Sequence, residues 1–91
     1  MPPLSDDDIQ RRLSGRPGWT RDGDTLKRQF EFENFVASVD FVNRITPPAE
    51  EMNHHPDIAI SWNRVTIRTW SHDANAITER DTALARALDA L

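Results

Sequence analysis

Apolar residues recur along this chain with two different periods, one typical of helices and the other typical of strands. At the N-terminus, Ser5 and Asp8 form a helix start signal, and Ile9 and Leu13 then lie on one helical face. Glycine is unfavourable inside a helix, so Gly15 is expected to end this element. The pattern therefore predicts a short amphipathic helix at the start of the chain.

Two hairpins are predicted where apolar and polar residues alternate with a period of two. The dipeptide Asp22-Gly23 is typical of a hairpin turn, and residues 26–32 then place Leu, Arg, Phe and Phe on one face of a strand. The second hairpin covers residues 58–69 and turns at Trp62-Asn63-Arg64, with large side chains at every second position on either side of the turn.

The middle of the chain predicts a helix with an interruption. Asn34 can cap this helix, because asparagine is a favoured residue at that position. The run Thr46-Pro47-Pro48 removes backbone donors, yet it also resembles a new start with Thr46 as the cap. We therefore expect a kink or a restarted helix at the prolines, and an end at Pro56. The apolar face is expected to comprise Phe35, Val36, Val39, Phe41, Val42 and Ile45.

The last predicted element is a helix that begins at Thr78. The residues Thr78-Glu79-Arg80-Asp81 resemble a capping box with Asp in place of Glu or Gln, and Leu84, Leu88 and Leu91 follow on one face. The order of elements is therefore α-β-β-α-β-β-α. We expect one α+β domain over residues 1–91, with a four-stranded antiparallel sheet covered by helices on one face.

Composition narrows the classes of function. The net charge is −4, from 11 basic and 15 acidic residues, and the basic residues are scattered, which argues against a nucleic-acid-binding surface. The chain has no cysteine, which excludes disulfides and thiolate chemistry. No stretch approaches the roughly 18 apolar residues of a membrane span, and the first residues lack a signal-peptide pattern. We expect a cytoplasmic protein that binds neither membranes nor nucleic acid.

All three histidines lie between residues 54 and 72, as the pair His54-His55 and the single His72. Glu50 lies four positions before His54, so on a helix its carboxylate could fix the tautomer of that imidazole. Spacing alone leaves three interpretations open: exposed polar residues at the ends of elements, a metal site, and general acid/base catalysis. Adjacent histidines point in divergent directions, which disfavours a metal site. Histidine titrates near neutral pH and can transfer protons without a cofactor.

The pattern Glu50-x-x-x-His54-His55-Pro56, followed at fixed spacings by Trp62, His72 and Asp81, resembles that of the pterin-4a-carbinolamine dehydratases. This family is also known as the dimerisation cofactor of a hepatocyte homeodomain transcription factor. The flanking residues Asn53, Asn63 and 78–81 agree with the family, and so does the predicted order of elements. The chain departs from it at Pro47-Pro48 and at Trp70, whose bulky ring is expected to narrow the entrance of the pocket.

The resemblance implies a dehydratase that eliminates water from 4a-hydroxytetrahydropterin and yields quinonoid dihydropterin. It implies that His54 and His72 are the acid/base pair and that His55 binds and orients the pterin. It also implies that Glu50 orients His54. The further substrate-binding residues that it implies are Pro56, Trp62, Ser71, Asp73, Ala74, Arg80 and Asp81. Two of these have structural alternatives, because Trp62 could be a core residue at a strand end and Asp81 simply the helix cap.

The resemblance implies no metal and no cofactor, since the pterin is the substrate, and a link to aromatic amino acid hydroxylases, which need reduced pterin. We also expect a homodimer or homotetramer, because a chain this short is marginally stable alone and Leu84, Leu88 and Leu91 exceed what a thin core needs. The alternative function is a non-catalytic module that dimerises or binds a partner. The presence of all three histidines and of Glu50 favours the enzyme.

Overall fold

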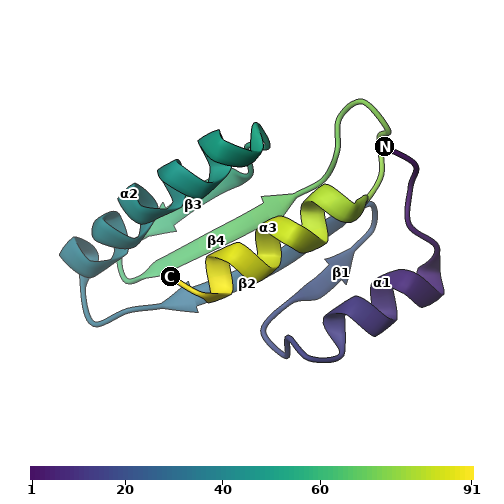
Figure 1. Cartoon of the computed structure of the whole chain (residues 1–91). Helices are drawn as coiled ribbons and strands as arrows, with labels where there is room; N and C mark the ends of the chain where they lie inside the picture. Colours follow the sequence, from purple (N-terminus) through teal and green to yellow (C-terminus); the bar gives the residue numbers. More distant parts are fainter.

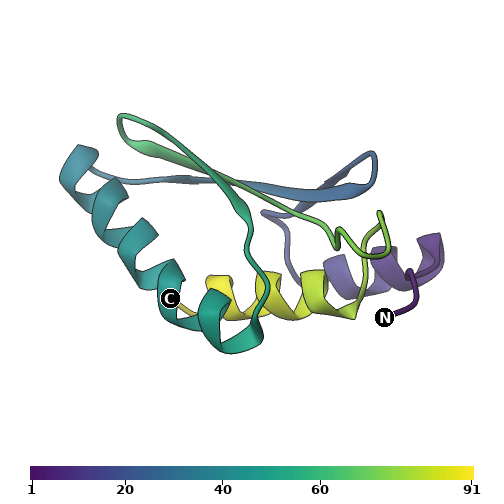
Figure 2. The same cartoon turned by 90° about the horizontal axis from the view of Figure 1, so that it is seen from above.

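Four strands form one antiparallel sheet, and three helices cover a single face of it (Figure 1, Figure 2). The computed structural model describes residues 1–91 and confirms the predicted α+β fold. No helix is both long enough and apolar enough to cross a membrane. The elements are α1 (Asp6–Leu13), β1 (Thr20–Asp22), β2 (Thr25–Glu31), α2 (Phe35–Met52), β3 (Asp57–Ser61), β4 (Arg64–Thr69) and α3 (Glu79–Asp89).

The sheet has the order β1-β2-β4-β3, so β2 and β4 are its central strands. Their register places Leu26 opposite Thr69 and Phe30 opposite Val65. Alternate side chains of a strand face opposite sides, and Val65, Ile67 and Thr69 are all buried on the helix-covered side. β3 lies at the edge of the sheet and is exposed along its whole length. The buried polar residue Thr69 therefore ends an otherwise apolar row.

The start signals in the sequence are present as helix caps. The side chain of Ser5 accepts a hydrogen bond from the backbone N–H of Asp8, and Asn34 caps α2 in the same way. Thr78 and Asp81 form a capping box at the start of α3. In the first hairpin, Gly23 has a φ of 62°, a left-handed conformation that glycine adopts without strain. These local signals correctly predicted where the three helices begin and where the first hairpin turns.

Helix α2 runs through Pro47 and Pro48 as one helix, so of the two alternatives expected there, a kink or a restart, the restart is wrong. Each proline removes one backbone donor that would have bonded to the carbonyl four residues earlier. Those carbonyls belong to Asn43 and Arg44, which are exposed, so water can take the place of the missing donors. The expected end at Pro56 is also wrong, because the helix ends at Met52 and is capped by Asn53.

The core lies between the sheet and the helices and contains Leu26, Val65 and Ile67 from the sheet. Two expectations about its composition are wrong. Phe35 and Val36 of α2 are 52% and 66% exposed, and the buried face of that helix is formed by Ser38, Phe41, Ile45 and Ala49. In α3, Leu84 and Leu88 are buried in the core of the single chain, and Leu91 lies beyond the helix and is exposed. The leucines therefore do not form a surface stripe for association.

Candidate active site

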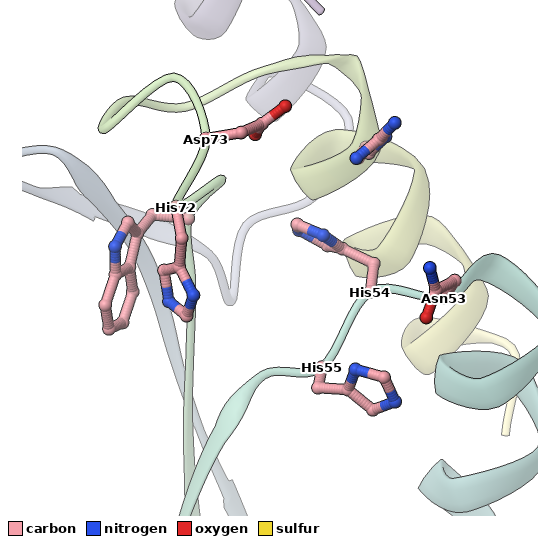
Figure 3. A pocket seen from close by; sticks show the side chains of 7 residues that line it. Asn53, His54, His55, His72 and Asp73 are labelled. Atoms are coloured by element: carbon pink, nitrogen blue, oxygen red, sulfur yellow. The ribbon is translucent and has the colours of Figure 1, made fainter.

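A pocket of about 360 Å³ opens where α2 ends and where β4 leads into the loop before α3. Figure 3 shows His54, His55 and His72 around this space, with Asn53 and Asp73 beside them. The fold therefore brings together all three histidines, although they come from two separate segments. The lining residues are Asn53, His54, His55, Trp70, His72, Asp73 and Arg80.

Asn53 ends α2 and sends the two adjacent histidines in different directions. Its φ of 50° and ψ of 45° are left-handed, a conformation that asparagine adopts more readily than most residues. After this turn His54 points into the protein and is only 7% exposed. The side chain of His55 remains 58% exposed. The two neighbours therefore have different environments.

The buried His54 pairs with Asp81 of α3. Nε2 of His54 lies 2.6 Å from Oδ1 of Asp81, and both side chains are almost fully buried. Glu50 pairs instead with Nε2 of His55 on the exposed side of the pocket. The expectation that Glu50 orients His54 is wrong, because the left-handed turn at Asn53 ends the helical spacing on which it relied.

The carboxylate of Asp81 is fully buried and accepts hydrogen bonds on both oxygens. Oδ1 accepts from Oγ1 of Thr69 at 2.6 Å, in addition to its contact with His54. Oδ2 accepts from Oγ of Ser71 at 2.9 Å and from the backbone N–H of Thr78 at 2.9 Å. Asp81 is therefore both a member of the capping box of α3 and the partner of His54, and these two contacts use different oxygen atoms.

This network determines which nitrogen of His54 is free. A carboxylate only accepts hydrogen bonds, so Nε2 of a neutral His54 carries the proton that is donated to Asp81. The hydroxyl of Thr69 lies 3.2 Å from the same nitrogen and donates its own proton to Asp81. Nδ1 of His54 is then left with a free lone pair and can accept a proton. The positive charge that results would be stabilised by the buried carboxylate.

His72 follows β4 in a loop whose ends are fastened together. Ser71 and Ala76 form a two-way backbone bridge, with N···O distances of 2.9 and 3.3 Å. The imidazole of His72 makes no hydrogen bond within the chain, and its ring packs against the indole of Trp70, with centroids 4.6 Å apart. Both ring nitrogens of His72 are therefore available to a ligand.

Arg80 and Asp73 contribute opposite charges to the pocket lining. The guanidinium of Arg80 and the carboxylate of Asp73 form no ion pair with each other or with any other side chain. Both groups can therefore bind a polar ligand without first breaking an internal contact.

Six of the residues implied by the resemblance do not line the pocket: Glu50, Pro56, Trp62, Ser71, Ala74 and Asp81. Ser71 lies beneath it and supports Asp81, while Pro56 and Ala74 are only adjacent in sequence to lining residues. Trp62 lies in the turn between β3 and β4, at the opposite end of β3 from His55, and is 65% exposed. Trp62 is therefore neither a wall of this pocket nor a core residue.

The sequence did not point to Thr69, and it predicted for Trp70 only that its ring would narrow the pocket entrance. A signal for Thr69 was present, because a polar residue continues the buried alternation of Val65 and Ile67. Hydrogen bonding lowers the pKa of two carboxyls, that of Asp8 through Ser5 and that of Asp22 through Arg68, and both lie outside the pocket. No three His, Asp or Glu side chains are grouped so that they could hold a metal ion.

The sequence model of the family described as "Pterin 4 alpha carbinolamine dehydratase" matches residues 2–91. Two similar proteins carry the name "putative pterin-4-alpha-carbinolamine dehydratase". The protein of Thermosynechococcus vestitus is 47% identical over 97% of this chain and 93% of its own length. The protein of Thermomicrobium roseum is 50% identical over 97% of this chain and 95% of its own length.

Two solved structures resemble this one. A protein from Brucella melitensis, described as a transcriptional coactivator/pterin dehydratase, has a TM-score of 0.91 and 28% identity over 97% of this chain and 96% of that one. A pterin dehydratase-like protein, described as a RuBisCO assembly factor in the alpha-carboxysome, has a TM-score of 0.65 over 79% of this chain and 83% of that one. At 22% identity the second likeness concerns the fold alone.

Proposed function

We propose, because the chain belongs to the pterin 4 alpha carbinolamine dehydratase family, that it converts 4a-hydroxytetrahydropterin to quinonoid dihydropterin by histidine acid/base catalysis. The family and its named relatives support the dehydratase activity. The observation that carries the assignment of residues is the buried pair of His54 and Asp81, which opens onto the same pocket as His72.

The reaction requires two proton transfers and no change of oxidation state. The bond between C4a and the hydroxyl oxygen breaks, and the oxygen leaves as water after it receives a proton. The neighbouring ring nitrogen loses its proton, and its electron pair forms the new double bond to C4a. One group must therefore donate a proton while another accepts one, on either side of a bound substrate.

His54 is suited to accept the proton from the ring nitrogen. Its Nε2 is bonded to Asp81, so Nδ1 is the basic nitrogen, and the imidazolium that forms remains paired with a buried carboxylate. The same division of labour between an aspartate and a histidine operates in the Ser-His-Asp triad. His72, with no internal hydrogen bond, is then the group that protonates the departing hydroxyl.

His55 and Glu50 have a different part in this proposal. Their pair lies on the exposed side of the pocket, where both side chains are more than half exposed to solvent. A solvated imidazole held by a carboxylate is suited to bind a polar edge of the pterin in ground state and transition state alike. Arg80 and Asp73 can bind further polar atoms, because neither is engaged elsewhere.

The proposal requires no metal and no cofactor, because protonation and deprotonation by imidazole are sufficient for the elimination. It places the protein in the cytoplasm, as one domain, in a homodimer or homotetramer. Its product is the oxidised pterin that a reductase would return to the tetrahydro form for aromatic amino acid hydroxylases. Each of these features is part of the proposal and can be tested separately.

The deciding experiment is a time-resolved assay of 4a-hydroxytetrahydropterin decay. The substrate dehydrates without a catalyst, so the rate must be compared with a protein-free control and with the variant His54→Ala. We expect the wild type to accelerate the decay in proportion to its concentration and the variant to do so far less. A wild-type rate equal to the protein-free control would overturn the proposed function.

The alternative is a partner-binding module without catalysis. Two observations favour it: the Brucella melitensis protein is described as a transcriptional coactivator as well as a dehydratase, and Phe35, Val36 and Trp62 of this chain are exposed. A module of this kind would not depend on the three histidines. Binding to a partner that survives their replacement, combined with no dehydration, would favour this alternative over the enzyme.

A further inference from the structure

The three histidines of the pocket differ in what orients them. His54 is held by the buried carboxylate of Asp81, and His55 is held by Glu50. His72 has neither a carboxylate nor a hydroxyl within hydrogen-bonding distance. Its one aromatic neighbour is Trp70, whose ring lies 4.6 Å away between centroids at an angle of 60°.

The backbone on either side of Trp70 is held in place. The residues on either side of it, Thr69 and Ser71, are each only 1% exposed, and both donate hydrogen bonds to Asp81. The backbone of Ser71 is also bridged to Ala76. Because alternate residues of an extended segment share a side, the side chains of Trp70 and His72 emerge together, opposite Thr69 and Ser71. The network that holds Asp81 therefore also fixes the backbone from which the indole of Trp70 and the imidazole of His72 emerge.

An indole can orient an imidazole without engaging either of its nitrogens. Aromatic rings attract one another in tilted and offset arrangements at centroid distances of about 4.5 to 7 Å. The face of an indole also attracts a cation, so the contact persists when the imidazole is protonated. A carboxylate would instead occupy one nitrogen and hold the proton there.

We propose that Trp70 is the positioning residue of His72, holding its imidazole so that both nitrogens remain free for proton transfer. This inference rests on the proposed function. It extends that function to a residue at which the chain departs from the pattern of the family it resembles. In each of the two acid/base histidines the orienting contact then leaves the reactive nitrogen unoccupied.

The test compares Trp70→Leu with Trp70→Phe in the dehydration assay. Loss of one aromatic contact should lower kcat by about two- to twelvefold in Trp70→Leu, with little change in KM. Trp70→Phe should recover most of the loss, because it restores an aromatic face. Phe35→Leu, which removes an exposed aromatic ring outside the pocket, is the matched control and should behave as the wild type.

A double-mutant cycle separates positioning from a general loss of structure. In a His72→Ala background there is no imidazole to orient, so Trp70→Leu should cause no further fall in kcat. Equal falls in both backgrounds would overturn the proposal. A rise in KM at unchanged kcat would also overturn it, because Trp70 would then contact the substrate instead.

The contact can be observed independently of activity. The chain has three histidines, so three imidazole Cε1–H resonances are expected in the NMR spectrum, each assigned by a single His→Ala variant. Trp70→Leu should move the resonance of His72, which lies beside the ring, and leave that of His55 in place. An unmoved His72 resonance would overturn the proposal while leaving the dehydratase activity intact. An inactive wild type would instead overturn the proposed function, and the role of Trp70 with it.

Discussion

His54 and Asp81 are 27 positions apart in the sequence, yet Nε2 of one lies 2.6 Å from Oδ1 of the other inside the protein. A histidine that serves as a base needs a fixed tautomer, and this contact supplies it. The same carboxylate joins the end of α2, the end of β4 and the first turn of α3.

We expect Asp81→Asn to have a large effect on kcat and a smaller effect on thermal unfolding. The amide oxygen can still accept the bond from the backbone of Thr78, so α3 keeps its cap. The charge that stabilises protonated His54 is lost, and we expect kcat to fall by about 10²-fold, as for loss of a general base. Steady-state kinetics and thermal unfolding measure the two effects. Asp7→Asn, at an exposed position of α1, is the matched control. An unchanged kcat in Asp81→Asn would contradict the role given to the pair.

The three histidines should respond unequally to replacement by alanine. His54→Ala and His72→Ala remove proton transfer and should mainly lower kcat, by about 10²-fold, at the low end for such groups because the uncatalysed reaction is not very slow. His55→Ala removes a ground-state contact and should mainly raise KM. All three should remain folded, as circular dichroism can establish. Wild-type kinetics in all three variants would show that the pocket has been misplaced. A His54→Ala variant that unfolds would show instead that this histidine is structural.

Glu50→Gln should have a small effect that is confined to binding. Glu50 pairs with the exposed His55, and exposed ion pairs contribute little because solvent and salt screen them. We therefore expect a KM raised by no more than a few fold and an unchanged kcat. Glu51→Gln, the neighbouring exposed carboxylate, is the control. A large fall in kcat would instead support the arrangement expected from the sequence, in which Glu50 orients His54.

Asp89 should matter for stability and not for catalysis. Its carboxylate lies at the end of α3 and accepts hydrogen bonds from Trp19 at 2.8 Å, Arg16 at 3.1 Å and Arg28 at 2.6 Å. Asp89→Ala leaves three donors without their acceptor, and we expect a loss of roughly 2 to 4 kcal/mol in the free energy of unfolding. Urea denaturation measures it, with the exposed Asp24→Ala as the control. If Asp89→Ala lowered kcat under conditions in which the variant is fully folded, the prediction that Asp89 has no part in catalysis would be wrong.

Exhaustive dialysis against a chelator should leave the activity unchanged. Nε2 of His54 is bonded to Asp81 and Nε2 of His55 to Glu50, so two of the three imidazoles already have a partner at that nitrogen. Metal analysis and kinetics before and after dialysis test this. A stoichiometric metal whose removal abolishes turnover, and whose return restores it, would contradict acid/base catalysis by the histidines alone.

The order of helices and strands could be predicted from the sequence because its causes are local. Caps such as Ser5 and Asn34 act on backbone groups within the same turn, and the alternation of residues 26–32 reflects the geometry of one strand. The sequence left open whether α2 kinks or restarts at Pro47 and Pro48, because a local pattern does not show whether water can reach the carbonyls of Asn43 and Arg44.

The sequence by itself determined which residues are candidates for the functional site, since the identities and spacing of the three histidines and Asp81 carry the family resemblance. Tertiary structure alone decided how they pair. Helical spacing favoured Glu50 as the partner of His54. The left-handed turn at Asn53 instead places His55 beside Glu50 and directs His54 into the protein. Asp81 reaches His54 only because the packing of α3 against β4 brings distant segments together. A periodic pattern reports which side of its own element a residue occupies, whereas a pairing depends on how separate elements pack.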